Sequence, residues 1–258
     1  MVKGLYTAYT GMINEQNRMD IMTNNLANAS TVGYKKEGST SQSFDDVLTV
    51  KIKDQSVGMR NVQRLGVKNP GVKIGENYTD YSQGSFRITG NTYLALSGEG
   101  FFAIEFTNKA GETDTKYTRA GQFTLNKDGY LVTEEGDYVL DTQNRRIRLN
   151  TLIDSSITDD GTIYQNGQAV AKIQVTDFED YDYLEKYGET YYQPIQGAKT
   201  IAAKAQVKSG YLEMANVQIV SEMVNLISIT RAYESNQKVV QTIDDTLDVA
   251  VNQIGRVQ

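Results

Sequence analysis

Four residues near the middle of the chain have the spacing of a calcium-binding loop. Asn126, Asp128, Gly129 and Glu135 match its third, fifth, sixth and twelfth positions. The first position, normally an acidic ligand, would be Thr124, and the flanking residues alternate as they do in strands. A turn between two strands therefore explains these residues better than a cation site does, and we expect no bound metal.

Two other polar segments also have ordinary explanations. Gly98-Glu99-Gly100 resembles the start of a dinucleotide-binding loop, but no third glycine follows and the next segment has the pattern of a strand. Asp177, Glu179, Asp180 and Asp182 form an acidic run, which is most simply a solvated loop. We therefore expect no catalytic residues, no cofactor and no small-molecule substrate.

The composition excludes several classes of site. The 258 residues include no Cys, His or Trp, so disulfides, thiol nucleophiles, imidazole bases and the usual structural zinc sites are impossible. A Ser-Lys or carboxylate pair is chemically possible, but no convergent polar constellation stands out. The net charge of −6 and the pI near 4.9 leave no basic surplus to neutralise phosphates, so we expect no nucleic-acid partner.

The chain contains no run approaching the ~20 apolar residues of a membrane-spanning helix. Its first residues, Met1 to Leu5, lead into an amphipathic pattern, whereas a secretory signal peptide has an apolar run followed by a cleavage site. This pattern predicts either a cytosolic protein or one that is exported without cleavage of its N-terminus.

Both ends of the chain carry an apolar stripe with alternating steps of three and four residues, typical of helices buried by a partner helix. In the N-terminal stripe Glu15 fills one position, and the others are Leu5, Ala8, Met12, Met19, Met22 and Leu26. The C-terminal stripe slips in register near Gln237, and its members are Ile219, Met223, Leu226, Thr230, Tyr233, Val240, Ile243, Leu247, Ala250 and Ile254. The two ends should therefore pair with one another or with the ends of neighbouring copies.

The C-terminal pattern also widens into a second apolar stripe formed by Val217, Val220, Val224 and Ile227. The whole pattern covers about 40 residues, or about 60 Å of helix, which is longer than a small β domain needs for cover. A helix with two apolar faces needs more than one neighbour. An intramolecular pair in a monomer is therefore the weaker alternative to assembly.

The central part of the chain changes to a period of two from about Ser85. Closely spaced short strands alternate there with turn pairs such as Asp128-Gly129 and Asn166-Gly167, which indicates an all-β domain. The predicted fold class is α+β, with long N- and C-terminal helices in a coiled-coil-like layer and a central all-β domain. The expected segments are 1–36 (N-terminal helix), 37–75 (extended connector or long hairpin), 76–203 (β domain) and 204–258 (C-terminal helix).

Several segments resemble bacterial flagellar rod and hook proteins. Residues 24–35 (NNLANASTVGYK) resemble their N-terminal signature, and residues 231–238 (RAYESNQK) resemble their C-terminal signature, led in by Asn216-Val217 and residues 222–224. Segments 89–91, 98–102, 117–121 and 129–132 are similar to the core domain of these proteins. Three separated groups of motifs in the same order cover nearly the whole chain.

The resemblance implies a non-enzymatic structural subunit of the flagellar rod in the basal body, of the distal-rod type or its close proximal-rod relative. It implies export through the flagellar type III export apparatus without a cleaved signal peptide, and polymerisation with copies of itself and other rod and hook subunits into a torque-transmitting tube. The terminal helices of this family line the channel. A rival hypothesis from another class is a secreted coiled-coil adhesin or effector with a β head.

On this basis, assembly contacts are expected at both ends of the chain. In the first helix and the turn that ends it, the expected residues are Leu5, Met12, Met19, Met22, Asn24, Asn25, Leu26, Asn28, Gly33 and Tyr34. Gly33 is expected to adopt a positive φ as the chain leaves the helix. In the second helix the expected residues are Ile219, Met223, Leu226, Ile227, Arg231, Tyr233, Glu234, Asn236, Val240, Ile243 and Leu247.

Overall fold

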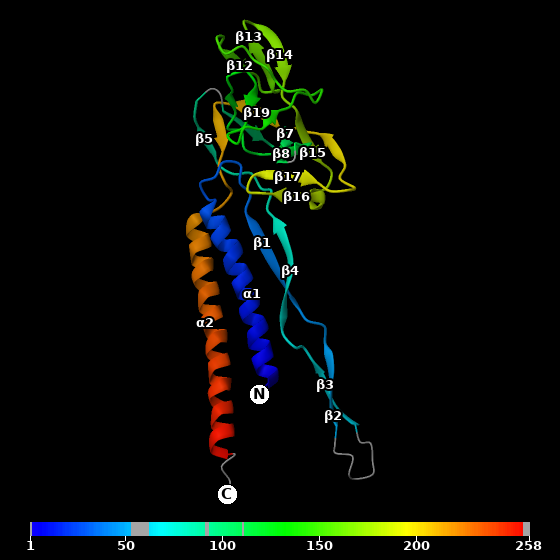
Figure 1. Ribbon diagram of the computed structural model, residues 1–258, viewed down its shortest axis with the longest axis vertical. Coiled ribbons are helices and arrows are strands. Elements are labelled where there is room, and N and C mark those ends of the chain that lie inside the picture. The colour runs from blue at the N-terminus through cyan, green and yellow to red at the C-terminus, as the bar shows by residue number, and fades with distance from the viewer. Residues whose placement is uncertain (1, 53–61, 91–92, 110, 255–258) are drawn as a thin grey trace. The chain divides into compact units, whose positions relative to one another are not determined.

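The computed structural model describes residues 2–52, 62–90, 93–109 and 111–254 (Figure 1). The chain forms two compact units, each assembled from separate pieces of sequence. We call the first the helical unit, which comprises Met1–Leu26, Glu37–Thr79 and Ile219–Gln258. We call the second the β unit, which comprises Ala27–Lys36 and Asp80–Gln218.

Two long helices begin and end the described chain. Helix α1 spans Val2–Ala27, and α2 spans Ile219–Val249, followed by a π-helical turn at Ala250–Ile254. With strands between them, the fold is a mixture of helix and sheet with an N-terminal helix, a central β domain and a C-terminal helix. Among the described residues, none of the helices is long and apolar enough to cross a membrane.

The segment that follows α1 in the helical unit is a long antiparallel ribbon. Strand β1 (Glu37–Ser43) pairs with β4 (Val72–Thr79), and β2 (Val47–Ile52) pairs with β3 (Val62–Lys68). The described residues between α1 and the β unit therefore form two antiparallel strand pairs. The ribbon is bonded to α1, because Thr7 Oγ1 donates to the carbonyl of Pro70 (3.0 Å) and Ser41 Oγ donates to Asn14 Oδ1 (3.1 Å).

The β unit is built around one nine-stranded sheet with strand order β16-β17-β8-β7-β11-β10-β9, in which β15 also pairs with β7 and with β18. The bounds of these strands are β7 Phe101–Thr107, β8 Thr113–Thr118, β9 Thr124–Leu125, β10 Leu131–Val132, β11 Tyr138–Val139, β15 Val175–Phe178, β16 Leu184–Tyr187, β17 Tyr191–Pro194 and β18 Thr200–Ala202. A 3₁₀ turn at Tyr181–Tyr183 precedes β16.

Smaller sheets complete the β unit. One has the order β12-β13-β14, and two antiparallel pairs, β6 with β19 and β5 with β20, join distant parts of the sequence. Their bounds are β5 Phe86–Ile88, β6 Leu94–Ser97, β12 Ser155–Ile157, β13 Thr162–Gln165, β14 Gln168–Lys172, β19 Gln206–Ser209 and β20 Tyr211–Glu213.

The core of the β unit contains two groups of buried side chains. The larger group is centred on residues such as Leu94, Phe102, Phe123 and Ile163, and the second is aromatic, including Phe101 and Tyr192. Phe101 and Phe102 are adjacent on β7 and belong to different groups, because successive side chains of a strand point to opposite faces. Both faces of β7 are therefore covered.

The structure explains the calcium-like spacing and corrects the interpretation of the acidic run. Asn126 Oδ1 accepts the backbone N–H groups of Asp128 and Tyr130 (3.0 and 2.8 Å), which makes this segment a turn. The prediction of a solvated loop is wrong for Asp177. Its side chain is buried and accepts the hydroxyl of Tyr181 (2.7 Å), because β15 places it on a covered face.

The observed units also differ from the segments expected near residues 36 and 204. Residues 27–36 are part of the β unit, although the sequence grouped them with the first helix. Residues 206–213 form β19 and β20, so α2 begins only at Ile219, fifteen residues beyond Lys204. The backbone groups of residues 206–213 bond to β6 and β5, and a helix cannot use those bonds.

Candidate assembly site

The expected apolar stripe of α1 lies on a half-buried face of the helix. Leu5, Met12, Met19, Met22 and Leu26 are all half-buried. Glu15, which fills a position in this stripe, bonds to Arg18 one turn later (3.0 Å). The stripe is therefore only partly covered within the chain, which leaves apolar area for a further neighbour.

Asn25 is fully buried within the helical unit and has a clear intrachain role. Its side-chain amide donates to the carbonyl of Glu37 (2.7 Å) and accepts the N–H of the same residue (2.9 Å). The last turn of α1 is thereby fixed to the first residue of β1. Asn24, one residue earlier, has an exposed side chain.

The covered stripe of α2 has a different register from the one expected. It continues without a slip through Glu222, Leu226, Ile229, Tyr233, Asn236, Val240, Ile243, Leu247 and Ala250, all buried or half-buried, with alternating steps of four and three. The expected slip near Gln237 is therefore wrong. Asn236, a polar residue, continues the stripe, so the apolar pattern is interrupted there although the covered face is not.

Helices α1 and α2 lie side by side in the helical unit (Figure 1). They approach at two glycines of α1, where a methyl group added to Gly4 would lie 3.5 Å from Cδ1 of Ile243, and one added to Gly11 would lie 3.0 Å from Nδ2 of Asn236. The absence of side chains at these glycines thus leaves room for the side chains of α2.

The opposite side of α2 is exposed. Ile219, Val220, Met223, Val224 and Ile227 are between 47% and 77% exposed and follow the helical spacing i, i+1, i+4, i+5 and i+8, so they form one apolar surface, which we call the apolar arc. Farther along the helix, the expected assembly residues Arg231 and Glu234 also have exposed side chains.

The chain leaves α1 through a tight turn in the β unit. Gly33 has a φ of +71°, as expected, and its N–H donates to the carbonyl of Glu213 (2.8 Å). A methyl group at Gly33 would lie only 2.3 Å from the backbone nitrogen of Ala120. Both the dihedral angle and the close approach of Ala120 therefore require glycine.

The other two expected residues of this turn are also held within the β unit. Asn28 Nδ2 donates to Glu189 (2.8 Å), and Asn28 Oδ1 accepts the hydroxyl of Thr31 (3.1 Å). Tyr34 is fully buried, and the ammonium group of Lys186 lies 4.2 Å from the centre of its ring. These contacts fix the turn against strands that lie far away in the sequence.

A buried ionic cluster follows directly after the turn. Lys35 Nζ lies 2.6 Å from Glu213 Oε1, and Arg119 lies 3.3 Å from the other carboxylate oxygen. The three side chains are only 1%, 0% and 4% exposed. Burial lowers the pKa of Lys35, and the charge of Glu213 offsets part of this effect.

Asn216 joins the three pieces of chain that surround this cluster. Its Oδ1 accepts the N–H of Lys36 (2.8 Å), and its Nδ2 donates to the carbonyl of Asp80 (2.7 Å) and to the hydroxyl of Ser82 (3.0 Å). No sequence pattern predicted this network. Lys35, Arg119 and Asn216 all lie within the recognised motifs, but nothing in their spacing indicated that they meet at Glu213.

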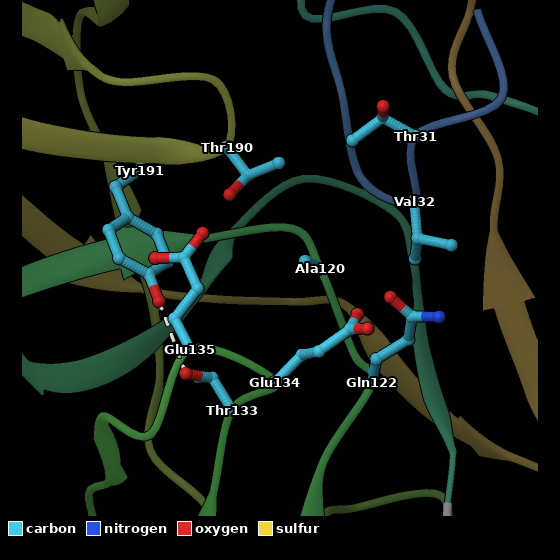
Figure 2. A pocket seen from close by; sticks show the side chains of 9 residues that line it. All are labelled: Thr31, Val32, Ala120, Gln122, Thr133, Glu134, Glu135, Thr190 and Tyr191. Carbon is cyan, nitrogen blue, oxygen red and sulfur yellow. Dashed lines mark hydrogen bonds between the residues drawn. The ribbon is translucent and has the colours of Figure 1, made fainter. Parts of the chain in front are cut away.

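A hollow of about 160 Å³ lies beside the turn in the β unit (Figure 2). Thr31 and Val32 lie on one side of it, opposite Thr190 and Tyr191. The hydroxyl of Tyr191 is 3.1 Å from Thr133 Oγ1 and donates to Asp137 (2.8 Å). The turn after α1 therefore forms one wall of this hollow. The other lining residues are Ala120, Gln122, Thr133, Glu134 and Glu135.

Three family models match successive parts of the chain. One described as flagella basal body rod protein matches residues 5–35, one described as flagellar hook protein FlgE/F/G D1 domain matches 95–167, and one described as flagellar basal body rod FlgEFG protein C-terminal matches 208–254. The first and third contain the turn and α2, and the second contains much of the nine-stranded sheet.

Relatives match over their full length. The flagellar basal-body rod protein FlgG of Bacillus subtilis (strain 168) is 34% identical, with 98% of this chain and 99% of the relative covered. FlgF of Caulobacter vibrioides is 31% identical, and the flagellar hook-basal body complex protein FlhO of Bacillus subtilis is 30% identical, each with complete coverage of both chains. The chain therefore belongs to the family of flagellar basal-body rod proteins.

Proposed function

We propose that this structural subunit of the bacterial flagellar rod polymerises into a helical tube that transmits torque and encloses part of the export channel. In this proposal α1 and α2 of many copies form a coiled-coil-like inner layer, and other rod and hook subunits continue the same axial structure. The role requires no catalytic chemistry. The family assignment and the two long terminal helices support it.

The main structural support for this proposal is the exposed apolar arc of α2. Its five members cover the first three turns of the helix, with Val220 the most exposed at 77%. Burying a side chain such as Val or Ile contributes about 1.5–3 kcal/mol, so a partner that covers this surface gains considerable stability. The exposed residues beside the arc on the same turns are polar: Ser221, Asn225 and Ser228.

The partner that covers the apolar arc is a second copy of the chain. If the arc of one copy contacts a different surface of the next, the contact is heterologous, and repeated contacts that do not close into a ring produce an open helical polymer. We further propose that the subunit reaches the basal body through the flagellar export apparatus without cleavage of a signal peptide. Its N-terminal helix then remains available for the inner layer.

The test is electron microscopy of the concentrated purified protein and of two matched variants. Wild-type protein should form helical tubes. Val224→Asp should abolish them, because the new carboxylate would be buried without a partner in the contact. Asn225→Asp places the same group on the adjacent polar side of the helix and should leave the tubes intact.

Discrete particles from wild-type protein, or equal effects of the two variants, would overturn this proposal. The comparisons with known proteins give no support to the adhesin or effector hypothesis, which requires a monomer or a closed oligomer. The same micrographs distinguish that outcome, since closed oligomers have a fixed size and do not lengthen with protein concentration.

A further inference from the structure

We infer that residues 27–36 form a segment that is already locked into the β unit of the unassembled subunit, and that Lys35 and Asn216 are the residues that lock it. This inference goes beyond the proposed tube. It assigns the turn after α1 to the preformed part of the subunit, and it leaves α1 as the part that gains order from its neighbours.

The first observation is the burial of the charges around Glu213. The carboxylate accepts Lys35 through one oxygen and Arg119 through the other, and Oε1 also accepts the N–H of Gly84 (3.0 Å). Lys35 Nζ also donates to the carbonyl of Ser82 (2.7 Å). Buried charges with several partners resist separation, because removal of one partner leaves the others in a poorly solvated site.

The second observation is that the backbone of this segment is bonded on both sides of Tyr34. The N–H of Gly33 bonds to Glu213, the N–H of Lys36 bonds to the Asn216 side chain, and the carbonyl of Lys36 accepts the N–H of Asp80 (2.9 Å). The segment is therefore held by hydrogen bonds of its main chain as well as by contacts of its side chains.

The third observation concerns where the chain passes between the two units. It does so after residues 26, 36, 79 and 218, and Asn216 bonds to residues next to two of these points, Lys36 and Asp80, while itself lying near a third. One side chain of the β unit thus joins residues 36, 80 and 216, each of which lies next to a point where the chain passes between the units.

The expected behaviour can be measured by hydrogen–deuterium exchange of the full-length, unassembled protein. The amides of Gly33 and Lys36 should exchange as slowly as those of the core strand β7, and about 100-fold more slowly than amides in the first half of α1. If electron microscopy showed no tubes, the proposed function would be refuted, but the exchange pattern expected here would not change. The two proposals can therefore be refuted independently.

Variants separate specific locking of this segment from the general stability of the β unit. Lys35→Met should raise exchange at residues 31–36 by about 10-fold, while β7 amides remain protected. Lys36→Met is the matched control, because the Lys36 side chain is half-buried and its ion pair with Asp80 is long, at 4.0 Å, and therefore weak. This variant should change exchange less than twofold. Asn216→Ala should raise exchange at Lys36 in the same way.

Two results would overturn the inference. One is exchange at residues 31–36 of the wild-type protein as fast as in α1, which decides the question even if a variant does not fold. The other is an equal change in Lys35→Met and Lys36→Met, or a change that spreads over the whole β unit. Either would show that the segment is not specifically locked.

Discussion

At the scale of single residues, Gly33 combines two constraints that can be measured separately. Its φ of +71° disfavours any residue with a side chain, and the backbone of Ala120 leaves no space for one. The turn lies in the β unit, so strain there lowers the stability of that unit as well as disturbing assembly. This corrects the simpler view that the turn concerns only the helical layer.

Gly33→Val should lower the free energy of unfolding of the β unit and prevent assembly. Backbone strain alone costs on the order of 1–3 kcal/mol, and the contact with Ala120 adds to it. Urea denaturation of the unassembled protein measures the effect. Gly136→Val is the control, since Gly136 has a φ of +99° but no atom lies within 4 Å of the place where its Cβ would be. Equal losses in the two variants would contradict a role for the close packing.

Asp160 gives a pH dependence with a definite sign. Hydrogen bonds from Thr158 and Thr162 lower the pKa of this carboxyl from 3.8 to about 2. Because its folded pKa is depressed, the contribution of Asp160 is fully present above pH 3.8 and is lost as the pH falls through about 2. The difference in stability between wild type and Asp160→Asn, measured by urea denaturation, should therefore shrink from pH 5 to pH 2. A difference that stays constant with pH would show that the charge has no role.

At the scale of elements, the two faces of α2 differ in how far they are covered. The covered stripe, which includes Leu226, Tyr233 and Ile243, is already partly buried within the helical unit. The side chains of the apolar arc are about half exposed or more. A helix of this kind is stabilised by partners on two sides, which suits a subunit within an assembly better than one at the surface of a monomer.

Ile243→Asp should prevent polymerisation while the β unit stays folded. The carboxylate would replace a side chain that lies close to Gly4 of α1, and burying it unpaired costs several kcal/mol. Circular dichroism checks the fold and electron microscopy checks assembly. Gln241→Glu adds a charge of the same sign at an exposed position nearby and should still assemble. Full-length tubes from Ile243→Asp would contradict the assignment of the stripe.

At the scale of the whole molecule, the sequence order does not match the order of the compact units. The chain enters the β unit at residue 27, leaves it for the ribbon, returns at residue 80 and leaves again for α2. A stable core defined as one continuous stretch of sequence would therefore omit residues 27–36, and one that ended at residue 203 would also omit β19 and β20. This matters for any experiment that isolates the core.

Limited proteolysis of the unassembled protein should trim both terminal helices, because narrow apolar stripes without full cover cannot offset an ordering cost of about 1–2 kcal/mol per residue. The protected material should extend to about Gln218, beyond the boundary near Ala203 that the strand pattern suggested, and should retain residues 27–36. Mass spectrometry of the fragments identifies their ends. Termini as resistant as the β unit would refute the prediction, and loss of residues 204–218 would contradict the observed unit.

Elements with a local signal could be predicted from the amino-acid sequence. The periodicity of the N-terminal residues indicated a long first helix, alternation and glycine turns identified the β region, and the segments at 24–35 and 231–238 indicated the family. It also predicted the positive φ of Gly33. Each of these depends on neighbours within a few residues, where steric and periodic rules act directly.

Contacts between residues far apart in the sequence could not be predicted and are seen only in the folded chain. Glu213 contacts Lys35 across 178 positions and Arg119 across 94, and no local pattern encodes either contact. The same holds for Asn216, a half-buried side chain that bonds to residues 36 and 80. Asp177, by contrast, has local hydrogen-bond partners, Phe178 and Tyr181, and it is buried because β15 lies within the nine-stranded sheet.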